Sequence, residues 1–103
     1  MVMWEFVVRP GRESMFEQIY GPEGDWARCF RKGEGYLGTE LSRDLNKPRR
    51  YVTADFWKSR ASYENFKIEF AKEYEDLDQK CKALTEHERE IGRFERVITE
   101  TEK

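Results

Sequence analysis

Residues 50–84 read RYVTADFWKSRASYENFKIEFAKEYEDLDQKCKAL, and this stretch decides the fold. Residues 50–58 alternate between two faces, which predicts a β-strand. Ser59 follows the strand and is a residue type that favours helix N-caps. Beyond it, apolar side chains recur every three or four positions, at Phe66, Phe70, Tyr74, Leu77, Cys81 and Leu84. This spacing predicts a single amphipathic helix of about seven turns.

Three further strands are predicted outside this stretch, at residues 2–8, 36–43 and 90–98. The first is apolar on both faces, as central strands are. An interrupted helical connection is expected between the first two strands, where Gly21 and Pro22 break the helical pattern. Strict alternation in the second strand places Leu37, Thr39 and Leu41 on one face, and Tyr36, Gly38, Glu40 and Ser42 on the other.

The predicted order of elements is therefore β-α-β-β-α-β. Right-handed crossovers convert this order into a ferredoxin-like α+β fold: a four-stranded antiparallel sheet with the first and third strands in its centre and two helices on one face. Because both central strands are apolar on both faces, the face without helices needs a cover. A second copy of the chain is the simplest cover, so a homodimer is expected.

The composition excludes several classes of protein. A chain of 103 residues is the size of one domain, here 1–103, with residues 99–103 expected to form a disordered tail. A net charge of −2 argues against a nucleic-acid partner. The sequence contains no apolar run of the roughly 20 residues that a membrane span needs, so no membrane partner is expected.

Metal-ligating residue types are scarce. Cys29, Cys81 and His87 are far apart in sequence and lack the spacing of a zinc site. We therefore expect no metal and no cofactor. Two separated cysteines are typical of free thiols in a reducing compartment, which predicts a cytoplasmic protein.

An aromatic pocket is the candidate site. Trp4 and Trp57 fall on neighbouring central strands, and Thr53, Asp55 and Glu40 are predicted to lie near Trp57. A cavity with aromatic walls and a few polar groups is the general form of a small-molecule site. The alternative is a packed aromatic core whose indole and phenol groups find internal partners.

Asp55 is the carboxylate that this pattern places among aromatic side chains. Burial raises the pKa of a carboxyl group, which would let Asp55 act as a base. The alternative is a salt bridge to Arg43, Arg49 or Arg50.

Three motifs resemble those of the antibiotic biosynthesis monooxygenase-like family. Residues 51–66, YVTADFWKSRASYENF, resemble its third strand and following helix; Arg9-Pro10-Gly11-Arg12 resembles its first turn; and residues 35–41, GYLGTEL, resemble its second strand. The resemblance implies the dimeric α+β barrel fold, in agreement with the homodimer expected above. Members include cofactor-independent oxygenases of aromatic polyketides, quinol oxygenases, haem-degrading enzymes and proteins of unknown role.

The resemblance also implies site residues. In the polyketide oxygenases a Trp at the strand end and a Tyr six residues later are pocket residues, and Trp57 and Tyr63 occupy these positions. An Asn lies four residues before the Trp in those enzymes, where this chain has Thr53. The haem degraders use an Asn on the first strand, where this chain has Trp4, so no haem is expected.

Two functions of different classes are therefore open. The first is a cofactor-independent monooxygenase that acts on aromatic or quinol-type small molecules. In that function Asp55 is the base, the walls are Trp4, Trp57 and Tyr63, and the orienting polar groups are Thr53 and Glu40. The second is a non-catalytic homodimer that binds a small ligand or only assembles. A pocket too small for an aromatic ring would favour the second.

Overall fold

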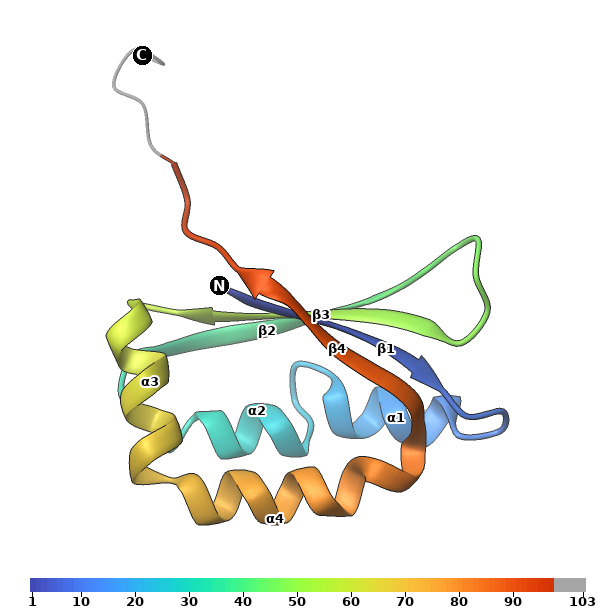
Figure 1. Ribbon diagram of the computed structural model, residues 1–103, viewed down its shortest axis with the longest axis horizontal. Helices are drawn as coiled ribbons and strands as arrows, with labels where there is room; N and C mark the ends of the chain where they lie inside the picture. Colours follow the sequence, from blue (N-terminus) through green and yellow to red (C-terminus); the bar gives the residue numbers. More distant parts are fainter. Residues whose placement is uncertain (98–103) are drawn as a thin grey trace.

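In a computed structural model that describes residues 1–97, two interrupted helical connections cover one face of a four-stranded antiparallel sheet (Figure 1). The elements are β1 (Val2–Val8), α1 (Glu13–Tyr20), α2 (Asp25–Phe30), β2 (Tyr36–Arg43), β3 (Arg50–Trp57), α3 (Arg60–Glu69), α4 (Ala71–Cys81), the short 3₁₀ turn η1 (Lys82–Leu84) and β4 (Thr85–Arg93). The predicted α+β ferredoxin-like class is confirmed. The predicted tail at residues 99–103 lies outside the described residues.

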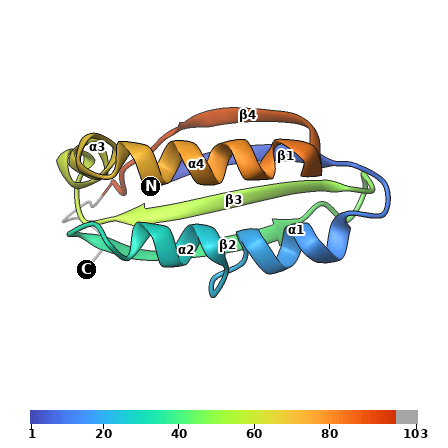
Figure 2. The ribbon, with the colours of Figure 1, turned by 90° about the horizontal axis from the view of Figure 1, so that it is seen from below.

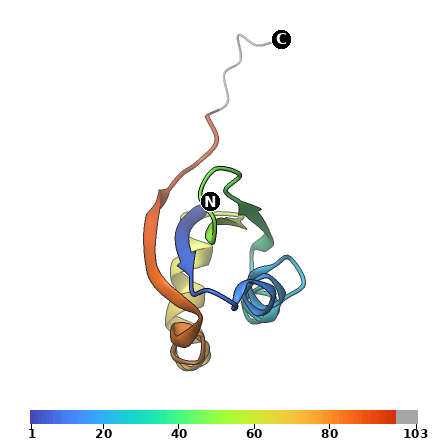
Figure 3. The ribbon, with the colours of Figure 1, turned by 90° about the vertical axis from the view of Figure 1, so that its right-hand side faces the viewer.

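The strand order is β2-β3-β1-β4, so β1 and β3 are the central strands, as predicted. Seen from the helical side, α1 and α2 run beside α4 along the strands (Figure 2). The sheet curls around these helices (Figure 3). Between the two layers lies a core whose largest fully buried side chains are Phe16, Phe66 and Val8. None of the helices within residues 1–97 is long and apolar enough to cross a membrane.

A β-bulge near the start of β2 changes which side chains point inward. The register with β3 shifts between Tyr36 and Gly38, and Gly38 has φ of 147°, a conformation that favours glycine. Tyr36 pairs with Trp57 and packs on the helical face, whereas Leu37 is 69% exposed. The strict alternation predicted for this strand was therefore wrong at its first residues, because the bulge inserts one extra residue.

The predicted seven-turn helix is divided into two. Ser59 caps α3 as expected, since its Oγ accepts a hydrogen bond from the Ser62 N–H at 3.1 Å. Phe70 leaves helical geometry, with φ of −112° and ψ of 32°, and the chain turns there (Figure 1). A straight helix of this length would span about 39 Å, whereas an eight-residue strand spans only about 27 Å. The turn at Phe70 lets α3 begin beside β3 and lets α4 run back along the strands beside α2 (Figure 1).

The last strand begins earlier than predicted. β4 starts at Thr85 instead of residue 90, because its pairing with β1 begins opposite Val8. Phe94 and Val97, which the prediction placed in this strand, follow it and are exposed. Both cysteines are free and buried, in agreement with the predicted free thiols.

The second face of the sheet carries no helix from residues 1–97. Met3, Val7, Val52 and Phe56 are partly exposed there. In their midst Glu5 accepts hydrogen bonds from two arginines, Arg50 at 2.6 Å and Arg89 at 2.8 Å. The hydrogen bonds from Arg50, and then from Arg89, lower the pKa of Glu5. The face is thus apolar with an internally paired ionic cluster at its centre.

Candidate functional site

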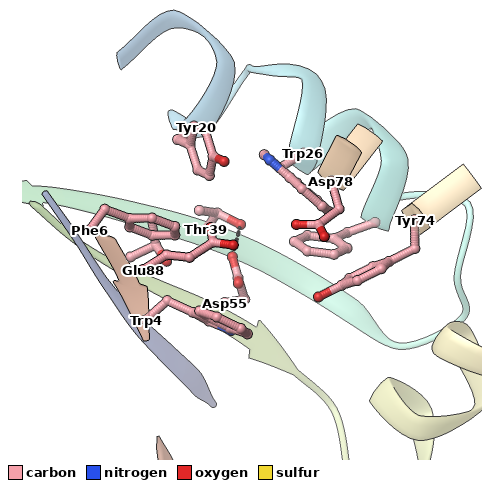
Figure 4. A pocket seen from close by; sticks show the side chains of 11 residues that line it. Trp4, Phe6, Tyr20, Trp26, Thr39, Asp55, Tyr74, Asp78 and Glu88 are labelled. Carbon is pink, nitrogen blue, oxygen red and sulfur yellow. Dashed lines mark hydrogen bonds between the residues drawn. The ribbon is translucent and has the colours of Figure 1, made fainter. Parts of the chain in front are cut away.

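A pocket lies between the inner face of the sheet and helices α1, α2 and α4 (Figure 4). Its six aromatic walls are Trp4, Phe6, Tyr20, Trp26, Phe30 and Tyr74. Its five polar lining residues are Thr39, Thr53, Asp55, Asp78 and Glu88. Aromatic walls with a few convergent polar groups are the usual composition of a small-molecule site.

The enclosed part of this pocket is small. Its volume is about 40 Å³, within about 440 Å³ of empty space that includes the part open to solvent. A cavity of about 150 Å³ binds benzene, whereas a single water needs only about 10–15 Å³. In this arrangement of side chains the enclosed part holds water but no aromatic ring. Trp4 and Tyr74 are only half-buried, so they are the walls with the most freedom to move aside.

Asp55 is held on the pocket side of β3 by the alternation of that strand. It is 7% exposed, and its Oδ1 accepts a hydrogen bond from Thr39 Oγ1 at 2.7 Å. The Thr39 oxygen lies 2.6 Å from the Tyr36 hydroxyl. Since Thr39 gives its proton to the carboxylate, Tyr36 must donate to Thr39. The bulge that turns Tyr36 inward thus completes a chain of hydrogen bonds behind Asp55.

Burial raises the pKa of Asp55 to about 6, and the hydrogen bond from Thr39 opposes this rise. The salt bridge considered for Asp55 is not formed, because Arg43, Arg49 and Arg50 bind other acids. Their partners are Glu17 at 2.7 Å, Glu86 at 2.7 Å, and Glu5 at 2.6 Å with Asp44 at 3.0 Å, respectively. Asp55 is therefore a buried carboxyl group without a cationic partner among the described residues, able to exchange a proton near neutral pH.

Replacing Thr39 by valine should raise the pKa of Asp55 further. Valine keeps the volume but removes the hydrogen bond that stabilises the ionised carboxylate. We expect a rise of about one unit, since such a bond contributes about 1.5–3 kcal/mol before solvent compensates. Carbon-13 NMR of the Asp55 carboxyl group across a pH titration measures it. Thr85→Val, a buried threonine outside the pocket, is the control. An unchanged pKa in Thr39→Val would contradict the assigned hydrogen bond.

Three of the six residues predicted for the site line this pocket: Trp4, Thr53 and Asp55. Glu40 does not, because it pairs with Ala54, is exposed and faces away from the helices. The prediction for Glu40 fails because of the bulge: counted from Tyr36 in steps of two, residue 40 would point inward, but the extra residue turns Thr39 inward instead.

Trp57 and Tyr63 also lie outside the pocket lining. Trp57 is 8% exposed, and its ring packs 5.3–5.6 Å from those of Phe30, Tyr36 and Phe66. Tyr63 lies beneath it at 5.6 Å, and burial raises the pKa of Tyr63 to about 12. The alternative interpretation, a packed aromatic core, therefore describes Trp57 and Tyr63, whereas Trp4 lines the pocket.

Two acidic residues of the pocket, Asp78 and Glu88, were not predicted from the sequence. Asp78 lies four positions after Tyr74 on α4, and this spacing places it on the same helix face. Glu88 pairs with Phe6 across the sheet, which only the observed register of β4 reveals. Within residues 1–97 no group of three or more His, Cys, Asp or Glu side chains is arranged to hold a metal ion.

The chain is thus a small α+β protein with a ferredoxin-like fold, and an aromatic pocket that contains carboxylates lies under its sheet. Residues 1–69 match the family model described as antibiotic biosynthesis monooxygenase. The chain is thus a member of the antibiotic biosynthesis monooxygenase family. Curated protein sequences give no match.

Solved structures agree on the fold. A variant of SnoaB, a cofactor-independent oxygenase from Streptomyces nogalater, aligns with a TM-score of 0.71 and 20% identity over 98% of this chain and 95% of that one. PA3566 from Pseudomonas aeruginosa aligns with a TM-score of 0.61 and 14% identity, over 91% and 92% of the two chains. A putative monooxygenase from Fusobacterium nucleatum gives 0.63 and 20%, over 86% of this chain and 39% of that one. At these identities the likeness shows the shared fold alone.

Proposed function

We propose that this protein is a cofactor-independent monooxygenase for aromatic, quinol-type small molecules, with Asp55 as its base. The observation that carries the proposal is the position of Asp55: it lines an aromatic-walled pocket, is buried, and has no cationic partner among the described residues. A base with a pKa of about 6 is ionised at neutral pH and still basic enough to take a proton. Family membership and the structural likeness to SnoaB support the same function.

In the proposed reaction Asp55 takes a proton from a phenolic hydroxyl of the substrate. The resulting anion is electron-rich and donates electrons directly to O₂. A bond then forms between a ring carbon and oxygen, and the hydroperoxide loses water to leave a carbonyl group. One oxygen atom of O₂ ends in the quinone product and the other in water, and the substrate itself supplies the electrons. The proton held by Asp55 returns in the water that leaves.

Other side chains take supporting roles in this proposal. Trp4 stacks beside the substrate ring, and the Thr53 hydroxyl orients its oxygen atoms. Thr39 acts as a positioning residue, since its hydrogen bond holds the Asp55 carboxylate on the pocket side. Trp57 and Tyr63 support the pocket from the core behind it.

Oxygen consumption tests the proposal. The purified protein is mixed with a panel of phenols, hydroquinones and naphthohydroquinones, and O₂ uptake is followed against the uncatalysed rate. We expect uptake of one O₂ per substrate with at least one compound, and one atom of labelled oxygen in the product. Rates equal to the uncatalysed rate throughout the panel would contradict the proposal.

A homodimer formed through the second face of the sheet is part of the proposal, because that face is apolar and uncovered in the described chain. Sedimentation at micromolar concentration should give about twice the chain mass. Phe56→Glu places a charge on this face and should yield a monomer that is folded by circular dichroism. Leu45→Glu, in a loop where the side chain is 94% exposed, should stay dimeric. A monomeric wild type would contradict the dimer.

A non-catalytic binding protein is the second candidate, and one observation favours it: the enclosed volume of about 40 Å³ is too small for an aromatic ring. The two candidates differ in the same experiment. No oxygen uptake with any compound of the panel favours the second, whereas turnover requires that Trp4 or Tyr74 move aside to admit the ring.

A further inference from the structure

The pocket carries an unusual charge for a site that would hold phenols. Asp55, Asp78 and Glu88 project into one space from β3, α4 and β4 (Figure 4). No lysine, arginine or histidine is among its lining residues. With all three carboxylates ionised, the pocket holds three negative charges and no positive one.

The surrounding cations neutralise these charges only in part. Lys82 Nζ lies 3.6 Å from an oxygen of Asp78, but the Lys82 side chain is 54% exposed. His87 belongs to β4, but it points to the opposite face of the sheet, where it lies nearest Glu5. Burial, together with the charge of Asp78, raises the pKa of Glu88. Asp78 and Glu88 thus repel each other, and a bound cation would relieve this repulsion.

The aromatic walls of the pocket also favour a cationic ligand. The faces of Trp and Tyr rings attract cations, and a desolvated ring attracts them more strongly than an exposed one. Trp4, Trp26 and Tyr74 all line this pocket. Trp26 is also buried, and its indole N–H has no hydrogen-bond partner among the described residues. This nitrogen is on the side of the ring that faces Tyr20 (Figure 4).

We propose that the pocket selects an aromatic ligand that combines a ring hydroxyl with a protonated amine. The amine would lie between Asp78 and Glu88, and the hydroxyl would lie near Asp55. That this ligand is also the substrate rests on the proposed function. The positive charge of its amine also suits the proposed reaction. When Asp55 removes a proton, a phenolate forms beside Asp78 and Glu88, and the ammonium group of the same molecule offsets the new negative charge.

Three phenols that share the ring hydroxyl and the two-carbon side chain but differ in the group at its end test the proposal: tyramine, which is cationic, para-ethylphenol, which is neutral, and phloretate, which is anionic. Binding is followed at pH 7.5 by NMR titration of the nitrogen-15-labelled protein, using the indole signals of Trp4 and Trp26. We expect tyramine to bind at least about tenfold more tightly than para-ethylphenol, and phloretate to bind most weakly. Equal affinities, tighter binding of phloretate, or no binding of tyramine at millimolar concentration would overturn the proposal.

Isosteric variants identify which charges act. Asp78→Asn and Glu88→Gln should each reduce the preference for tyramine over para-ethylphenol by about threefold or more, with little change for the neutral ligand. Asp76→Asn is the matched control, since Asp76 lies on the same helix, is exposed and pairs with Lys72. A loss of preference in Asp76→Asn equal to that in Asp78→Asn would mean that only the overall charge matters, which overturns the proposal.

The two proposals fail separately. A preference for tyramine without oxygen uptake by any phenol leaves the charge selectivity standing and contradicts the oxygenase. Oxygen uptake with neutral hydroquinones, together with equal affinities for the three probes, supports the oxygenase and overturns the charge selectivity.

Discussion

Replacing Asp55 by asparagine is expected to lower kcat/KM for oxygen-dependent oxidation by about 10²–10⁴-fold, the usual contribution of a positioned general base. Asparagine keeps the shape and the carbonyl that accepts the Thr39 hydrogen bond, but it cannot take a proton. Oxygen uptake by both proteins measures the loss. The matched control is Asp76→Asn on the solvent side of α4, which should keep the full rate. If Asp55→Asn keeps at least half of the wild-type rate, Asp55 is not the base.

The pH dependence provides a second readout for Asp55. Since the base must be ionised, kcat/KM should rise with pH and level off above about 6. Stability changes in the opposite direction. The pKa of Asp55 is raised in the folded state, so the folded protein binds more protons than the unfolded chain between about pH 4 and pH 6, and stability falls as pH rises through this window. Asp55→Asn lacks this dependence and should be at least as stable as the wild type at pH 7, so lost activity would not reflect unfolding.

Replacing Trp57 by alanine is expected to destabilise the protein by about 3–5 kcal/mol, the range for a large aromatic side chain removed from a core. Trp57 is buried, with four aromatic rings within 5.6 Å of its own. Trp4→Ala is the matched comparison, because Trp4 is half-buried and lines the pocket. Trp4→Ala should destabilise the protein by only about 1–2 kcal/mol, and it should weaken the binding of aromatic ligands. Denaturant unfolding and a ligand titration separate the two.

Trp57→Phe is the control for volume and polarity. Phenylalanine keeps much of the packing, and it removes an indole N–H that is buried without a partner among the described residues. Losing that unpaired donor offsets part of the lost contact, so the cost should be about 1 kcal/mol or less. If Trp57→Ala lowers the free energy of unfolding by less than Trp4→Ala does, and also weakens ligand binding, Trp57 is a pocket residue and not a core residue.

The strand pattern was predictable where the chain alternates without interruption. On β3, the period of two places Thr53, Asp55 and Trp57 on one face, and the structure keeps them there. The central positions of β1 and β3 follow from the order of elements and the hand of the crossovers.

Packing between distant segments decided the rest. The bulge at Leu37 turned Tyr36 and Thr39 toward Asp55 and turned Glu40 away, because Tyr36 packs against Trp57 of the neighbouring strand. The turn at Phe70 brought α4 back under the sheet and placed Tyr74 and Asp78 in the pocket.

The sequence by itself therefore determined the fold class, the central strands and the inward position of Asp55, since each depends on local periodicity and chain order. Only the tertiary structure decided that Trp4 lines the pocket while Trp57 fills the core. Both indoles lie on the inner face of the sheet, and their surroundings differ because α2 and α3 press Phe30 and Phe66 onto Trp57. The alternation of residues in β1 and β3 does not predict which helix side chains pack against each indole.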